Sequence, residues 1–197
     1  MRFRCLIGLV LGWALALSIV HAHVIVSQHG TLNIVGDNAF MVLSLPVSAF
    51  KDIDDNGDGL LSASELRVHS ASIELQIKEG VQLENSLGIS TLGGLMLNTV
   101  PPEHDYTAPA KQIVVLGRYD LDSGSSGIKF TMRMFGVEID ERTEQITVTK
   151  GTRTQIINLT PENPTRDVLP PLWRTLVDKV QLAVACIFSL WQGILNT

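Results

Sequence analysis

Short runs in which apolar and polar residues alternate constrain the fold of this chain more than any other feature. The first three runs are HVIVSQ (23–28), TLNIVG (31–36) and AFMVLSL (39–45). Turn-forming residues separate them, namely His29-Gly30 and Gly36-Asp37-Asn38. Alternation bounded by turn residues is typical of half-buried strands, so this region is predicted to begin a β-sheet domain.

Alternation returns further along the chain. SIELQIKEGVQLE (72–84) predicts a strand that turns at Glu79-Gly80. QIVVLGRYDL (112–121) and GIKFTMRMFGVEI (127–139) flank DSGSSG and predict a hairpin, and EQITVTKGTRTQIINLT (144–160) predicts a second one turning at Lys150-Gly151. Glu138, Glu141 and Glu144 are expected on a solvated hairpin face. The predicted fold is a mainly β, antiparallel β-sandwich over residues 23–160.

The N-terminus has the pattern of a secretory signal over residues 1–22. A basic start, MRFR, precedes a long apolar run, and VHA ends at Ala22 as a small-residue cleavage site. Cleavage predicts an exported protein, periplasmic or extracellular, whereas an uncleaved segment would be a membrane anchor. Cys186 then remains as the single cysteine, so no internal disulfide is expected.

The C-terminal region differs from the β-rich part. Residues 161–171 contain several prolines and predict a linker, and residues 172–195 predict one helix that is amphipathic at first and apolar later. Three placements of this helix remain open: packing on the sandwich, lying in a membrane interface, or docking against a membrane protein. The expected partners through 172–195 are therefore a membrane surface or a membrane protein.

The charge balance excludes one class of partner. The chain has 15 basic and 20 acidic residues, and removal of the signal leaves 13 basic residues and a net charge of −7. Neither a basic stripe nor an Arg/Lys run with interspersed aromatic residues is present. Nucleic acid is therefore not an expected partner.

One acidic stretch, DDNGDGLLSASEL (54–66), predicts a metal site. Carboxylates this close repel one another unless a cation lies between them. Counting from Asp54 places oxygen donors at alternating positions, a glycine at the turn and a carboxylate at the twelfth position. The predicted ligands are Asp54, Asn56, Asp58, the carbonyl of Leu60, Ser62 and Glu65, and the predicted cofactor is Ca²⁺.

This stretch resembles the EF-hand family across about residues 47–70. The resemblance implies a helix–loop–helix inserted in the sandwich, with Gly59 at the sharp turn and Leu61 anchoring the loop to the core. VSAFKDI (47–53) is expected to form the first helix and SASELRVHS (62–70) the second, with a Ser-x-x-Glu capping signal. Phe50 and Leu66 are expected to join the two helices. The alternative is a surface turn without an ion, since turns also use Asp, Asn and Gly.

Enzyme signatures are absent from the sequence, which contains no G-x-S-x-G, H-E-x-x-H, C-x-x-C or P-loop pattern. The chain is therefore predicted not to be an enzyme, although a hydrolase with a dispersed site around His104 and Asp105 stays open. Cleavage after Ala22 would make His23 the N-terminal residue, where an amino group and an imidazole can chelate Cu(II) if His69 or His104 approaches.

A second resemblance covers about residues 23–165. HVIV, the DDNGDGLLSASEL insertion and GRYDLDSG are similar to exported ectodomains of the hydrogenase/urease accessory (HupE/UreJ-like) family. This implies a periplasmic metal-handling ectodomain that acts with a membrane transporter, which is the alternative function. The preferred interpretation is an exported calcium-binding protein in which calcium is structural or promotes partner binding.

Overall fold

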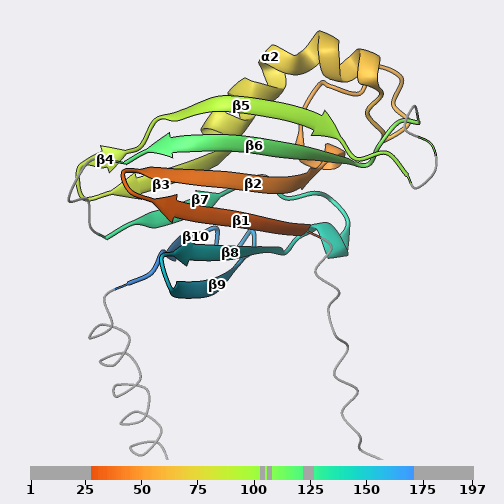
Figure 1. Ribbon diagram of the computed structural model, residues 1–197. Helices are drawn as coiled ribbons and strands as arrows, with labels where there is room; N and C mark the ends of the chain where they lie inside the picture. The colour runs from red at the N-terminus through yellow and green to blue at the C-terminus, as the bar shows by residue number, and fades with distance from the viewer. Residues whose placement is uncertain (1–27, 103–104, 106–107, 122–126, 171–197) are drawn as a thin grey trace, which may run out of the picture.

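The computed structural model describes residues 28–102, 105, 108–121 and 127–170, which are mainly β (Figure 1). Its strands form a six-stranded sheet in the order β5-β6-β2-β1-β8-β9 and a four-stranded sheet in the order β10-β7-β3-β4. The strands of the first sheet are β1 (Gln28–Val35), β2 (Asn38–Pro46), β5 (Leu92–Thr99), β6 (Gln112–Asp120), β8 (Glu144–Lys150) and β9 (Arg153–Leu159). Those of the second are β3 (Val81–Asn85), β4 (Gly88–Ile89), β7 (Lys129–Met132) and β10 (Thr165–Asp167). The α-helix is α2 (Ala63–Gly80), and the short 3-10 helices are η1 (Val47–Ala49) and η2 (Ile139–Glu141).

One predicted turn, at Gly36-Asp37-Asn38, and one predicted hairpin, over 144–160, are confirmed. β1 and β2 pair antiparallel up to Val35 and Asn38, and Gly36 takes a φ of 56° at the turn between them. β8 and β9 pair antiparallel up to Lys150 and Arg153, with Gly151 at a φ of 58°. Glycine adopts this left-handed conformation without steric cost, which explains why both turns fall where the sequence places them.

The prediction of a purely antiparallel sheet is wrong at one junction, because β1 pairs with β8 in parallel. The predicted turn at His29-Gly30 is also wrong, since both residues lie within β1. Gly30 serves close packing there instead. A Cβ atom at this position would lie 2.5 Å from Leu43 Cδ2 and 2.6 Å from Ile146 Cδ1, so a larger residue would force these two side chains to move.

Residues 72–80 form the second half of α2 and not the predicted strand. Ile73 and Ile77 are four residues apart, so they share one helix face and are fully buried, while Leu75 is 57% exposed. The spacing I-x-L-x-I fits both a strand and a helix in the sequence. In the structure, the helix that begins at the Ser62 cap continues through these residues to Gly80.

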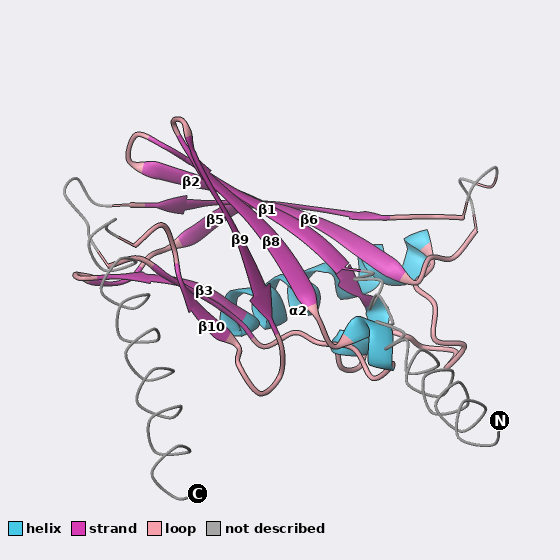
Figure 2. Cartoon of the chain, turned by 90° about the horizontal axis from the view of Figure 1, so that it is seen from below, coloured by secondary structure: helices cyan, strands magenta, loops and turns pink. Residues whose placement is uncertain are grey.

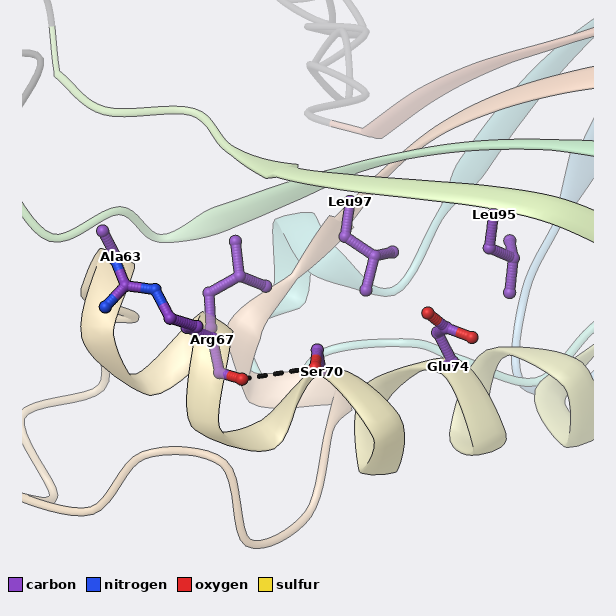
Figure 3. Close-up of a pocket in the computed structure, with 7 residues that line it drawn as sticks. Ala63, Arg67, Ser70, Glu74, Leu95 and Leu97 are labelled. Carbon is purple, nitrogen blue, oxygen red and sulfur yellow. Dashed lines mark hydrogen bonds between the residues drawn. The ribbon is translucent and has the colours of Figure 1, made fainter.

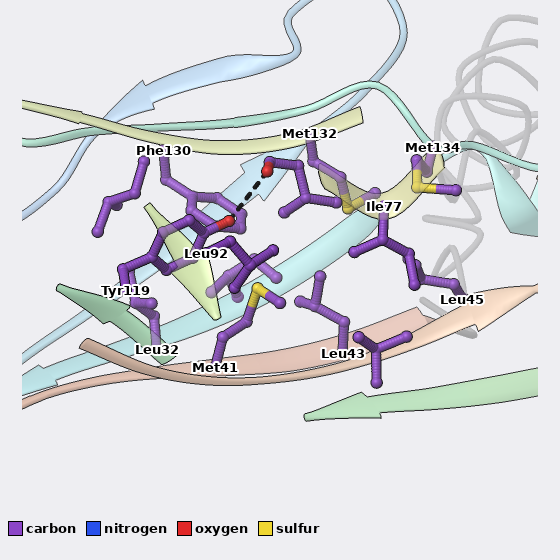
Figure 4. Close-up of a cluster of buried hydrophobic side chains, with 14 of the residues drawn as sticks. Leu32, Met41, Leu43, Leu45, Ile77, Leu92, Tyr119, Phe130, Met132 and Met134 are labelled. Carbon is purple, nitrogen blue, oxygen red and sulfur yellow. Dashed lines mark hydrogen bonds between the residues drawn. The ribbon is translucent and has the colours of Figure 1, made fainter. Parts of the chain in front are cut away.

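Figure 2 shows the two sheets and α2 as neighbouring layers, and one hydrophobic core joins them (Figure 4). Met41 and Leu43 of the larger sheet, Phe130 and Met132 of the smaller sheet, and Ile77 of α2 belong to one buried cluster. Tyr119 lies fully buried among them, and its hydroxyl donates a 3.0 Å hydrogen bond to the carbonyl of Val81. This bond connects β6 of one sheet to β3 of the other.

Two further expectations differ from the structure. The predicted hairpin over 112–139 is wrong, because β6 and β7 belong to different sheets. Residues 161–170, expected as a linker, contain β10, which pairs with β7, and Val168, which is buried in the core.

Both terminal predictions lie outside the described residues. These are the signal segment 1–22 with His23 at its end, and the helix 172–195. Within the described part of the chain, no helix has the length and apolar character needed to span a bilayer.

Candidate functional site

The acidic loop follows η1 and precedes α2, at one end of the larger sheet (Figure 1). The expected pair of flanking helices is not present in the described structure. Only the second is an α-helix, whereas the predicted first helix is the single 3-10 turn Val47–Ala49. Pro46 precedes this turn and Phe50 ends it in an extended conformation, and the chain then bends through residues 50–52, where Asp52 takes a φ of 55°.

Leu61 anchors the loop, as the sequence predicts. Its side chain is fully buried. Its backbone pairs with Ala110 just before β6, with an N–H to carbonyl distance of 2.8 Å in one direction and 3.0 Å in the other. Phe50 is buried and Leu66 packs against the core, so apolar contacts hold both ends of the loop.

The first half of the loop is organised around Asp54. Its Oδ1 accepts a hydrogen bond from the Gly57 amide and its Oδ2 one from the Gly59 amide, both at 2.7 Å. Gly59 has a φ of 75°, the left-handed conformation expected at this position. A Cβ atom at Gly59 would meet no atom within 4 Å. Backbone conformation, and not space, therefore requires glycine there.

Asn56 and Asp58 continue the same pattern. Asn56 Oδ1 accepts from the amide of Asp58 at 2.9 Å, and Asp58 Oδ1 accepts from the amide of Leu60 at 2.8 Å. Asn56 Nδ2 donates to Asp58 Oδ2 at 3.0 Å. Asn56 and Asp58 thus each order the backbone two residues later, whereas Asp54 orders it three and five residues later. Side-chain to backbone bonds of this kind also stabilise turns that hold no ion.

Glu65 lies at the first turn of α2 and completes a capping box with Ser62. Its amide donates to Ser62 Oγ at 3.2 Å, and its Oε2 accepts from the amide of Ser62 at 2.8 Å and from Ser62 Oγ at 2.7 Å. Its Oε1 accepts from the amide of Asp55 at 3.0 Å. The hydrogen bonds from Ser62 lower the pKa of Glu65, so this side chain is ionised at neutral pH.

The loop therefore closes on itself, because the carboxylate of its last residue bonds the amide next to its first residue, Asp54. Among the described residues, however, no three His, Cys, Asp or Glu side chains converge as a group that could hold a metal ion. The carboxylates of Asp54, Asp58 and Glu65 each point to nearby N–H or O–H groups. A carboxylate has about four acceptor positions, so these bonds leave further positions free on each.

His69 is a contact of the loop that the sequence analysis did not assign. Its Nε2 lies 2.9 Å from Asp55 Oδ1, and its side chain is 19% exposed. His69 follows Glu65 by four residues, so both lie on the helix face that meets the loop. This i, i+4 spacing from the closing glutamate is the sequence signal that could have identified it.

The other sequence-predicted sites receive no support from the described residues. His23 and His104 lie outside them, so the copper and hydrolase hypotheses stay untested predictions. The expected solvated face is wrong for Glu144, which is fully buried in β8.

Comparison with known proteins adds no relative from which a function could be transferred. No known protein family matches the chain, and neither does any curated protein.

Proposed function

We propose that this protein is an exported calcium-binding β-sandwich in which residues 54–65 hold one calcium ion. The side chains of Asp54, Asn56, Asp58, Ser62 and Glu65 and the carbonyl of Leu60 would be the ligands. With Glu65 using both oxygens, this set falls within the roughly six to eight oxygen ligands that calcium takes. All the donors are hard oxygens, which disfavours softer metals such as copper.

The hydrogen bond from the Asp55 amide to Glu65 Oε1 is the observation that carries this proposal. It brings the twelfth residue of the loop back beside the first, as a closing ligand requires. A simple turn explains the Asp and Gly residues, but it does not require a glutamate at this distance along the chain. The left-handed Gly59, bonded to Asp54, supports the same frame.

Calcium would change the electrostatics of the loop more than its outline. Residues 51–65 contain five acidic side chains and one lysine, and a divalent cation offsets their mutual repulsion. Glu65 would share its oxygens between the ion and the amides of Asp55 and Ser62. Because Leu61 is bridged to Ala110, an ordered loop fixes the start of α2 against β6.

The affinity is expected in the range of extracellular modules, a Kd of about 10⁻⁵–10⁻³ M, because the sequence contains no second loop of this type that could pair with the first and Asn56 supplies an amide in place of a carboxylate. Titration calorimetry of the full chain with calcium chloride should show one ion bound. Glu65→Gln removes a charge and a carboxylate oxygen, so the Kd should rise about tenfold or more.

Glu79→Gln is the matched control, because Glu79 is an exposed glutamate at the far end of the same helix. It should bind calcium as the parent does. Equal binding by the Glu65→Gln variant would refute the ligand assignment, and absence of binding heat in the parent at millimolar calcium would refute the proposed function.

A further inference from the structure

A groove runs between α2 and β5 at the edge of the larger sheet (Figure 3). Its volume is about 360 Å³. Leu95 and Leu97 point into it from β5, and Leu66, Arg67, Ser70 and Glu74 line it from α2. All three leucines are half-buried, so the groove offers an apolar surface that the rest of the described chain does not fill.

β5 lies at the edge of the larger sheet, and no described strand pairs with its outer side. Among the described strands it pairs only with β6. The amide of Val100 donates to the carbonyl of Gln112 at 3.0 Å, so the backbone N–H of Val100 points toward β6. Hydrogen-bonded and non-hydrogen-bonded pairs alternate along an antiparallel ladder, and the N–H and C=O groups of Leu97 and Thr99 therefore point away from β6.

The sequence of this strand does not protect its edge. LGGLMLNT (92–99) contains no charged residue and no proline, which are the usual means of blocking strand addition. A register shift between Gly93 and Met96, with Gly94 at a φ of 61°, distorts its first half. The second half, from Met96 to Thr99, keeps a regular register with β6 and is available for pairing.

Of the two charged side chains that line the groove, Glu74 has an ion-pair partner among the described residues and Arg67 does not. Glu74 pairs with Lys78 at 3.7 Å. Arg67 is exposed and forms no ion pair with any described residue. It also lies close to the N-terminus of α2, where the helix dipole adds positive potential. An acidic group in a ligand would therefore find an unpaired guanidinium at this end of the groove.

We propose that this groove binds an extended, acidic peptide segment of a partner protein, which adds as a strand to the edge of β5. The backbone of the segment would pair with Leu97 and Thr99. Its side chains alternate in direction, so every second one would enter the groove against Leu66, Leu95 and Leu97. An aspartate or glutamate of the segment would bond Arg67. This inference stands on the groove itself and does not depend on calcium binding.

Selection from a random-peptide phage library on the full chain tests the proposal. Enriched peptides should carry apolar residues two apart and an acidic residue at a fixed distance from them. The Arg67→Glu variant should bind the selected peptides about tenfold or more weakly than the parent does, and a selection on this variant should enrich basic peptides. Lys129→Glu is the matched control, because Lys129 is exposed on the other sheet and changes the net charge equally.

Thr99→Pro tests strand addition, because it removes an outward N–H without breaking the bonds to β6. It should abolish peptide binding, whereas Thr99→Val should retain it. The selection is carried out once with calcium and once with chelator, which separates this inference from the calcium proposal. Acidic peptides that are enriched in chelator would support peptide binding in the groove even if the loop bound no calcium. The proposal is overturned if no acidic pattern emerges, if Arg67→Glu selects the same peptides, or if the parent is a dimer that Thr99→Pro converts to a monomer.

Discussion

Glu144 is a carboxylic acid that lies fully buried beside another buried polar residue. β1 and β8 place it opposite Gln28, and both residues have no exposed surface. Neither carboxyl oxygen of Glu144, nor Oε1 of Gln28, has a hydrogen-bond partner among the described residues. Burial raises the pKa of Glu144 to about 8. The side chain is therefore mostly protonated at neutral pH, so it carries an O–H donor next to Gln28, whose Oε1 is an acceptor without a partner among the described residues.

This buried acid predicts a decrease in stability as the pH rises. Between the ordinary pKa of 4.5 and the folded pKa of about 8, the folded state keeps a proton that the unfolded state releases. Stability is therefore highest below the ordinary pKa and falls until the folded pKa is passed, by an amount on the order of 5 kcal/mol. Urea denaturation at pH 5 and pH 8 should show this loss in the parent. Glu144→Gln should remove most of it, and an equal loss in the variant would show that other groups are responsible.

The alternation of side chains along β8 predicts the correct, buried placement of Glu144. Glu144 is an even number of positions from Ile146 and Val148, which are both fully buried, so all three point to the same side of the sheet. The expectation of a solvated face followed from residue type, because an acidic residue is rarely buried. The expectation from residue type was therefore wrong, and the alternation of side chains along the strand gives the correct placement.

At the scale of elements, α2 shows where local signals suffice and where they do not. The capping box of Ser62 and Glu65 predicts the start of the helix correctly, because both partners lie within one turn. The end of the helix is not predicted, because Ile73 and Ile77 fit either period and tertiary burial decides between them. The absence of the predicted first helix from the described residues has a related cause, since Phe50 and Ile53 are buried by a non-helical segment that bends at residues 50–52.

The cap at Ser62 should contribute measurably to stability without calcium. Ser62→Ala removes the oxygen that accepts from the Glu65 amide, and the free energy of unfolding in chelator should fall by about 1 kcal/mol. Ser72→Ala, an exposed position in the middle of the same helix, should be neutral within about 0.5 kcal/mol. Thermal or urea denaturation measures both. An unchanged Ser62→Ala variant would mean that Glu65 holds the loop without the capping box.

For the whole molecule, the mainly β class, the turn at Gly36-Asp37-Asn38 and the hairpin over 144–160 follow from alternation and turn residues near each other in sequence. The parallel pairing of β1 with β8 and the division of β6 and β7 between two sheets do not. Both arrangements depend on tertiary contacts that no local pattern encodes. Gln28 and Glu144, which pair across β1 and β8, are more than a hundred positions apart in the sequence. The candidate loop lies between these cases. Its donor spacing and glycine were predictable, and its contact with His69 could have been inferred from the i, i+4 spacing to Glu65, whereas its attachment to Ala110 depends on the assembled sheets.

A crystal structure of the protein grown in millimolar calcium tests the central claim most directly. We expect one strong peak of density within about 2.3–2.6 Å of oxygens from Asp54, Asn56, Asp58 and Glu65, with both oxygens of Glu65 facing it. A loop that contains only water, with Glu65 bonded solely to Ser62 and Asp55 as described above, would contradict the claim. The acidic stretch would then be a turn held by its own hydrogen bonds.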